Sequence, residues 1–109
     1  MATAAPIDID MLRIRFIEYG LQYYAAGRCA VATALNPVAA NIIHHAVEMF
    51  LKAALCAHTT EDERRKLGHD LPKIWQRFKS QYDSKGTLAH FDDCVQGLHE
   101  YEDTGIRKG

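Results

Sequence analysis

The sequence predicts an all-α protein, an antiparallel four-helix up-and-down bundle. Apolar residues recur at three- and four-residue steps in four separate segments, which is the spacing of one helix face. The 109 residues contain no run that alternates apolar and polar positions as a half-buried strand would. The links between the four segments are short, which favours antiparallel neighbours. We therefore expect a disordered leader at residues 1–8 and a single helical domain at residues 9–107.

The first helix is expected to begin after Asp8 or Asp10, because either side chain can accept hydrogen bonds from its first free amides. Gly20 and Gly27 weaken this helix, and an alanine-rich run extends it to Leu35. Its apolar stripe consists of Met11, Ile14, Ile17, Leu21 and Tyr24.

The second helix is expected to be the central one. It starts near Pro37, since proline is tolerated in the first turn and disfavours a helical residue before it. Apolar residues then cover more than half of its circumference, whereas a surface helix shows a narrower stripe. Its polar line consists of His44, Glu48 and Lys52. Glu48 and Lys52 are four residues apart with the acid first, the favourable order for a helical ion pair.

The later helices are marked by their first and last residues. Thr60 with Glu63 fits a capping box for a short helix at about Glu61–Lys66, and Gly68 suits the left-handed position that ends it. Asp70 can cap the third helix. Apolar stripes mark the third helix (Leu71, Ile74, Trp75, Phe78, Tyr82) and the fourth helix (Leu88, Phe91, Val95, Leu98, Tyr101). The expected core draws on all four stripes: Ile17, Leu21, Ala46, Phe50, Ala53, Ile74, Trp75, Phe78, Phe91, Val95 and Leu98.

Composition excludes several classes of protein. A net charge of −1 provides no overall basic field for non-specific nucleic-acid binding. The three cysteines are widely spaced and form no CxxC pair, so we expect buried free thiols in a reducing cytoplasm. The second helix is too short and too charged for a membrane span. His44 with Glu48, and His90 with Cys94, have ligand-compatible spacing, but no HExxH or ExxH pair occurs. We therefore expect neither a metal site nor a cofactor.

Two stretches together resemble the HEPN domain family: Glu48-Met49-Phe50-Leu51-Lys52-Ala53 on the central helix and Gly68-His69-Asp70-Leu71 downstream. The resemblance covers roughly residues 10–107 and implies an all-helical, HEPN-like bundle with a link to nucleotides or RNA. A bundle unrelated to HEPN is the alternative.

The resemblance also suggests where ribonuclease residues would lie. HEPN ribonucleases carry an arginine followed a few residues later by a histidine, on a late helix lining a dimer groove. Arg64 and His69 fit this arginine–histidine pattern, but the predicted helix end at Gly68 lies between them. No arginine precedes His99 on the late helix. Arg64 and His69 are therefore weak catalytic candidates, and we expect a non-catalytic module.

The candidate ligand-binding residues are Glu48, Lys52, His69, Asp70 and Arg107. Lys52 either grips a phosphate or packs its stem and meets Glu48. His69 and Asp70 either line an anion site at the start of the third helix or serve as loop residue and cap. Arg107 is included because the segment before it resembles the family segment that leads into an Arg-Tyr-Pro turn. Here Lys108-Gly109 replaces Tyr-Pro.

The expected function is binding of a nucleotide, a nucleic acid or a partner protein such as a nucleotidyltransferase. The alternative is a dimeric HEPN ribonuclease toxin of a toxin–antitoxin pair. We expect a cytoplasmic homodimer, because relatives add a helix where this chain stops and uncovered apolar surface is costly in water. The expected interface lies on the first and fourth helices, at Phe16, Tyr23, Tyr24, Leu98 and Tyr101. Otherwise the first helix covers the gap within one chain.

Overall fold

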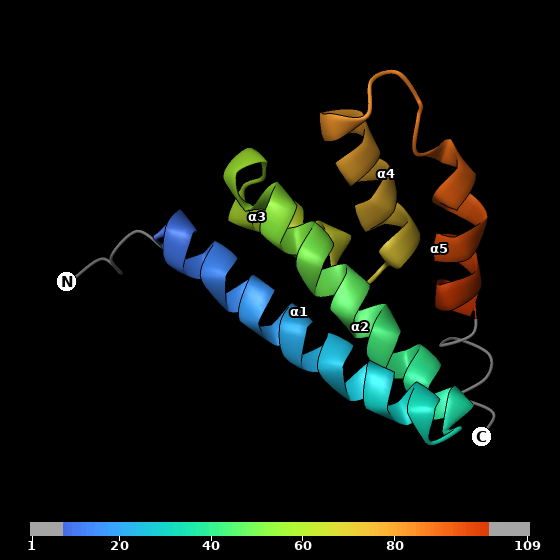
Figure 1. Ribbon diagram of the computed structural model, residues 1–109. Helices are drawn as coiled ribbons and strands as arrows, with labels where there is room; N and C mark the ends of the chain where they lie inside the picture. The colour runs from blue at the N-terminus through green and yellow to red at the C-terminus, as the bar shows by residue number, and fades with distance from the viewer. Residues whose placement is uncertain (1–7, 101–109) are drawn as a thin grey trace.

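Five α-helices follow one another between residues 8 and 100, the part of the chain that this computed structural model describes (Figure 1). They are α1 (Ile9–Ala32), α2 (Asn36–Leu55), α3 (Glu61–Leu67), α4 (Leu71–Tyr82) and α5 (Asp92–Glu100), with short 3₁₀ helices η1 (Cys56–His58) and η2 (Ala89–Phe91). No strand occurs among these residues, which confirms the all-α prediction. Residues 1–7 of the expected leader and residues 101–107 of the expected domain lie outside the described part.

Three predicted helix starts, those of α1, α3 and α4, are confirmed by their capping bonds. Asp8 accepts a hydrogen bond from the amide of Asp10 at 2.9 Å. Thr60 accepts one from the third residue of α3 at 3.1 Å, and Asp70 accepts one from the third residue of α4 at 3.2 Å. Gly68 ends α3 with a φ of +54°, a conformation that residues with a Cβ rarely adopt. Local sequence therefore defines these boundaries.

The α1–α2 hairpin depends on two glycines that, by sequence, are expected only to weaken α1. α1 and α2 run antiparallel along each other (Figure 1). A Cβ at Gly20 would lie 2.8 Å from the ring of Phe50, and one at Gly27 would lie 2.8 Å from Ile43. The missing side chains let the two helices approach closely. α1 ends at Ala32, three residues before the predicted end.

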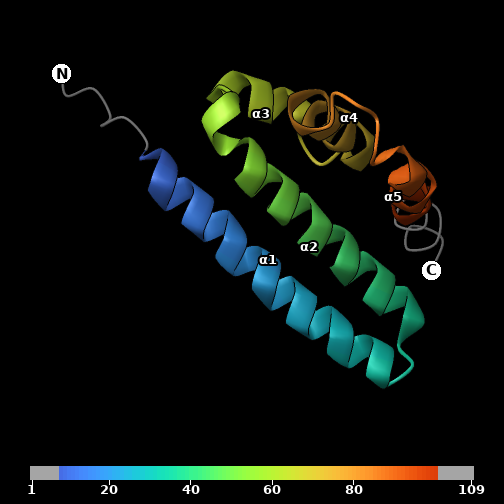
Figure 2. The ribbon, with the colours of Figure 1, turned by 45° about the horizontal axis from the view of Figure 1, so that its top comes forward.

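The second hairpin, α4–α5, packs on the side of α2 away from α1 (Figure 2). In that view α1 and α2 lie across the picture while α4 and α5 are strongly foreshortened, so the second hairpin crosses the first steeply. The hydrophobic core lies between α2 and this hairpin. Its buried members are Leu51, Leu55, Leu71, Ile74, Trp75 and Val95.

The start of α5 differs from the prediction. Leu88 was expected to open the last helix, but the α-helix begins at Asp92, after η2. The carboxylate of Asp83 accepts hydrogen bonds from the amides of Thr87 and Leu88 at 2.9 and 2.8 Å. These bonds hold the segment in a loop, because a side chain that satisfies backbone amides competes with helix formation.

The predicted core is confirmed on α2, α4 and α5 and wrong on α1. Buried members are Ala46, Ala53, Ile74, Trp75 and Val95; partly buried members are Phe50, Phe78 and Leu98. Ile17, Leu21 and Phe91 are instead 39%, 55% and 46% exposed. α1 turns a different stripe, with buried Gly20, Gly27 and Ala30, toward α2. Across residues 8–100, no helix combines the length and apolar character needed to cross a membrane.

Candidate functional site

The side chain of Glu48 lies at the centre of the polar line on α2, and it has no exposed surface. The helix is apolar on most of its circumference, and it is packed between α1 and the α4–α5 hairpin. A carboxylate in such a place must be matched by cations and hydrogen-bond donors, because burial removes its water. The residues around Glu48 therefore define the site.

One oxygen of this carboxylate, Oε2, is matched by two of the predicted residues. The amine of Lys52 donates to it at 2.9 Å, and Nδ1 of His69 lies 2.8 Å from it. The Lys52 side chain is only 13% exposed, whereas His69 is 81% exposed. The structure thus brings together Glu48, Lys52 and His69, and joins the loop before α4 to the middle of α2.

The other oxygen, Oε1, is buried and has no hydrogen-bond partner among the described residues. Close to it in the sequence stand His44, buried at 1% exposure, and half-buried His45. The ring of His99 on α5 stacks on that of His44 at 6.4 Å, and Tyr23 on α1 lies 5.3 Å from the ring of His45. Four of the six histidines, His69 included, therefore gather along this part of α2.

Asp70 acts as the cap of α4. Its carboxylate accepts from the amide of Lys73 at 3.2 Å, and the amine of Lys73 lies 3.9 Å from its other oxygen. The amide of Lys73 at this helix start is thus already bonded to a carboxylate. Arg107, the last predicted ligand residue, lies outside the described residues.

Arg64 and His69, the weak catalytic candidates, are engaged in different places. The Nη1 atom of Arg64 donates to the carbonyl oxygens of Thr59 and Cys56 at 2.6 and 3.3 Å, at the end of η1. His69 is held by Glu48. The guanidinium thus satisfies backbone oxygens where a helix ends.

The three cysteines carry free thiols, but only Cys56 is buried as expected; Cys29 and Cys94 are exposed. Burial raises the pKa of the Cys56 thiol, and the nearby charge of Arg64 opposes part of this rise. A buried thiol kept protonated is a poor nucleophile. Cys56 is therefore a packing residue.

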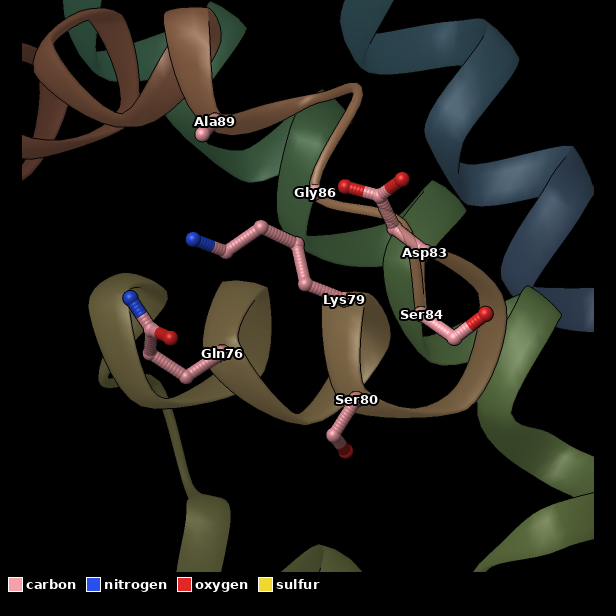
Figure 3. A pocket seen from close by; sticks show the side chains of 7 residues that line it. All are labelled: Gln76, Lys79, Ser80, Asp83, Ser84, Gly86 and Ala89. Carbon is pink, nitrogen blue, oxygen red and sulfur yellow. The ribbon is translucent and has the colours of Figure 1, made fainter.

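An open pocket of about 330 Å³ lies between α4 and the loop that precedes η2 (Figure 3). It is lined by small and polar side chains, with Lys79 and Asp83 as its charged members. The amine of Lys79 donates to Asp92 at 2.6 Å. Hydrogen bonds from the side chain of Thr87 and the amide of Leu88 hold the pKa of Asp83 below its usual value. Both charges thus hold the loop and α5 in place.

Sequence reasoning missed His45, His99 and Tyr23 as neighbours of this site. The sequence does contain a signal for His45, since the run His44-His45-x-x-Glu48 places both imidazoles one helical turn before the carboxylate. No local signal exists for the other two, which come from α1 and α5. Comparisons with known protein families, with curated proteins and with solved structures found no match.

Proposed function

We propose that this chain is a HEPN-like helical module with no catalytic activity, and that it works as a homodimer joined along α1. The observation that carries the proposal is an exposed apolar row on α1, here called the outer stripe. It consists of Ile14, Ile17, Leu21, Tyr24, Arg28, Val31 and Leu35, the last just beyond the helix end. In the proposed unit the two hairpins correspond to the four main helices of the HEPN bundle.

The spacing of the outer stripe favours a helical partner. Its positions alternate in steps of three and four residues, the repeat of a coiled-coil seam. The apolar members are between 39% and 55% exposed, so every one of them would gain from cover. On α1 the stripe extends from Ile14 to Val31, a length of about 26 Å at about 1.5 Å per residue.

A second copy of the chain is the partner that matches this surface. A two-fold dimer applies the same stripe to itself, so each copy supplies the apolar helix face that the other lacks. Arg28 is the one charged member of the stripe, and its guanidinium donates to the hydroxyl of Tyr24 at 2.9 Å. A single polar position within an apolar seam fixes the register of the two helices.

The proposed interface differs from the one expected from the sequence. Leu98 packs against the core cluster, so it supports the fold of one chain. Phe16 is half-buried, whereas Tyr24 is 45% exposed and belongs to the outer stripe. Tyr101 lies outside the described residues.

Binding of a protein is favoured over binding of a nucleotide phosphate. Lys52, the predicted phosphate ligand, is bonded to Glu48 and largely covered. The start of α4 already holds the carboxylate of Asp70. A nucleotidyltransferase, the partner that the resemblance suggests, would then bind the homodimer. The free thiols fit a reducing compartment such as the cytoplasm.

Two measurements on the full chain test the proposal. Light scattering at micromolar concentration should give about twice the chain mass of 12.3 kDa. Incubation with total RNA should leave the RNA intact, because Arg64 and His69 are engaged in separate contacts. Cleavage that disappears in an Arg64→Ala, His69→Ala variant would establish the ribonuclease alternative and overturn the non-catalytic assignment.

A further inference from the structure

Three ligand-type side chains meet on one face of α2, at its middle. His44, His45 and Glu48 can each offer one nitrogen or oxygen atom, and these three atoms all lie within 4.8 Å of one another. His44 stands four residues and His45 three residues before the carboxylate, the separations at which helical side chains are neighbours. His44 and Glu48 are buried, so most of the donor set is shielded from water.

The two imidazole rings have a separation that a shared metal ion requires. Their centroids are 5.6 Å apart and their planes are nearly perpendicular, at 84°. Two imidazoles on one zinc ion, each with its nitrogen about 2.1 Å from the metal, have centroids about 5.3 Å apart at a tetrahedral angle. The observed centroid separation is therefore compatible with two imidazoles that bind one ion.

The carboxylate of Glu48 provides a second, independent observation. Its Oε2 atom is matched by Lys52 and His69, whereas Oε1 is buried without a hydrogen-bond partner among the described residues. Native proteins rarely leave a buried polar atom in this state. A cation on the Oε1 side would satisfy it, and the bonds to Oε2 would keep the carboxylate oriented, as outer partners of metal ligands commonly do.

We propose that His44, His45 and Glu48 bind a Zn²⁺ ion. Two imidazole nitrogens and one carboxylate oxygen are a donor set that suits zinc, and three protein ligands leave one position for water. By sequence no metal site is expected, because neither an HExxH nor an ExxH pair occurs. Here both histidines precede the acid.

Metal content is the measurement that tests this site. The full chain, prepared without a histidine tag, is equilibrated with Zn²⁺ and dialysed, and zinc per chain is measured. We expect one equivalent for the parent, and a titration with Co²⁺ should produce the visible absorption of a tetrahedral ion. His45→Gln should weaken zinc binding at least about 100-fold, because loss of an outer partner alone costs about 10–100-fold.

Matched controls separate this site from binding by surface histidines. His58 and His90 are exposed and lie on other segments, so His58→Gln and His90→Gln should bind zinc like the parent. Glu48→Gln should lose binding as His45→Gln does. If Glu48→Gln fails to fold by circular dichroism, His45→Gln decides the question, since its side chain is half-exposed. Zinc binding by His45→Gln at parental affinity, or no binding by the parent, would overturn the proposal.

Discussion

Glu48 and Lys52 form a nearly buried ion pair, with side chains 0% and 13% exposed. Removing one member of such a pair leaves a charge without its partner in an apolar place. We predict that Lys52→Met lowers the free energy of unfolding by about 3 kcal/mol. Urea denaturation at neutral pH measures the change.

A double variant provides the control for that pair. Glu48→Leu with Lys52→Met removes both charges and leaves side chains of similar volume, so much of the lost stability should return. Equal stability of the parent and Lys52→Met would contradict the role given to this contact.

Among contacts between individual residues, the sequence predicts the local ones and misses those that depend on the packing of distant elements. The Glu48–Lys52 pair follows from four-residue spacing on one helix, and the three caps follow from residue type. The contact of Glu48 with His69, 21 residues away, depends on how the loop before α4 packs against α2. The stacking of His99 on His44 depends on where α5 docks, and no spacing rule provides that.

At the scale of elements, the α1–α2 contact is governed by the absence of side chains at Gly20 and Gly27. Alanine is normally better than glycine inside a helix by about 1 kcal/mol. At Gly27, however, a new Cβ would lie 2.8 Å from Ile43, and overpacking costs about 1–3 kcal/mol. We predict that Gly27→Ala lowers the melting temperature.

Gly97 on α5 offers a matched control, because a Cβ there would meet nothing within 4 Å. Gly97→Ala should therefore raise the melting temperature, as helix propensity alone demands. If both alanine variants are stabilising, the close approach of α1 and α2 is not as described.

α5 is attached to α4 through Asp92, which accepts from the indole of Trp75 and the amine of Lys79, both at 2.6 Å. These bonds lower the pKa of Asp92 below its ordinary value of 3.8, and the bond from Lys79 has the larger effect. The group thus stabilises the fold above that value and loses its contribution as the pH falls below it. We predict that the protection of the α5 amides, relative to the intrinsic exchange rate at each pH, falls selectively below about pH 4.

Substitution separates this effect from general acid unfolding. Asp92→Asn has no charge to lose, so the protection of the α5 amides should be low already at neutral pH and should change less on acidification. Asp93→Asn alters the next residue, which makes none of the described bonds to α4, and should behave like the parent. Equal acid sensitivity in all three proteins would refute the role of Asp92.

The wrong core prediction for α1 shows that the buried face of a helix is harder to predict than its position in the sequence. α1 has two apolar stripes about 100° apart, one rich in small residues and one rich in large residues. The sequence pattern favours the large side chains as the buried ones, and these are the exposed Ile17 and Leu21. The stripe of small residues is the buried one because Gly20 and Gly27 leave room for Phe50 and Ile43 of α2. This fit depends on the side chains of the partner helix, so the sequence of α1 alone does not predict it.

For the whole molecule, α2 is the element that holds the fold together, as its apolar sequence predicts. It contacts α1 on one side and α4 and α5 on the other (Figure 2). α4 and α5 cover each other and part of α2, so their large side chains form the core. α1 packs mainly on α2, and this one-sided position leaves its outer stripe exposed. The proposed dimer supplies the missing layer.

The most direct test of this account is the molar mass of a variant with a charge in the outer stripe. Leu21 is 55% exposed, so Leu21→Asp should leave the fold intact and its circular dichroism unchanged. Gln22→Asp places the same charge on the neighbouring exposed residue outside the stripe. We predict that the parent and Gln22→Asp have about twice the chain mass by light scattering, and that Leu21→Asp has a mass near 12.3 kDa. A monomeric parent, or a Leu21→Asp variant that still forms the dimer, would contradict the proposed interface.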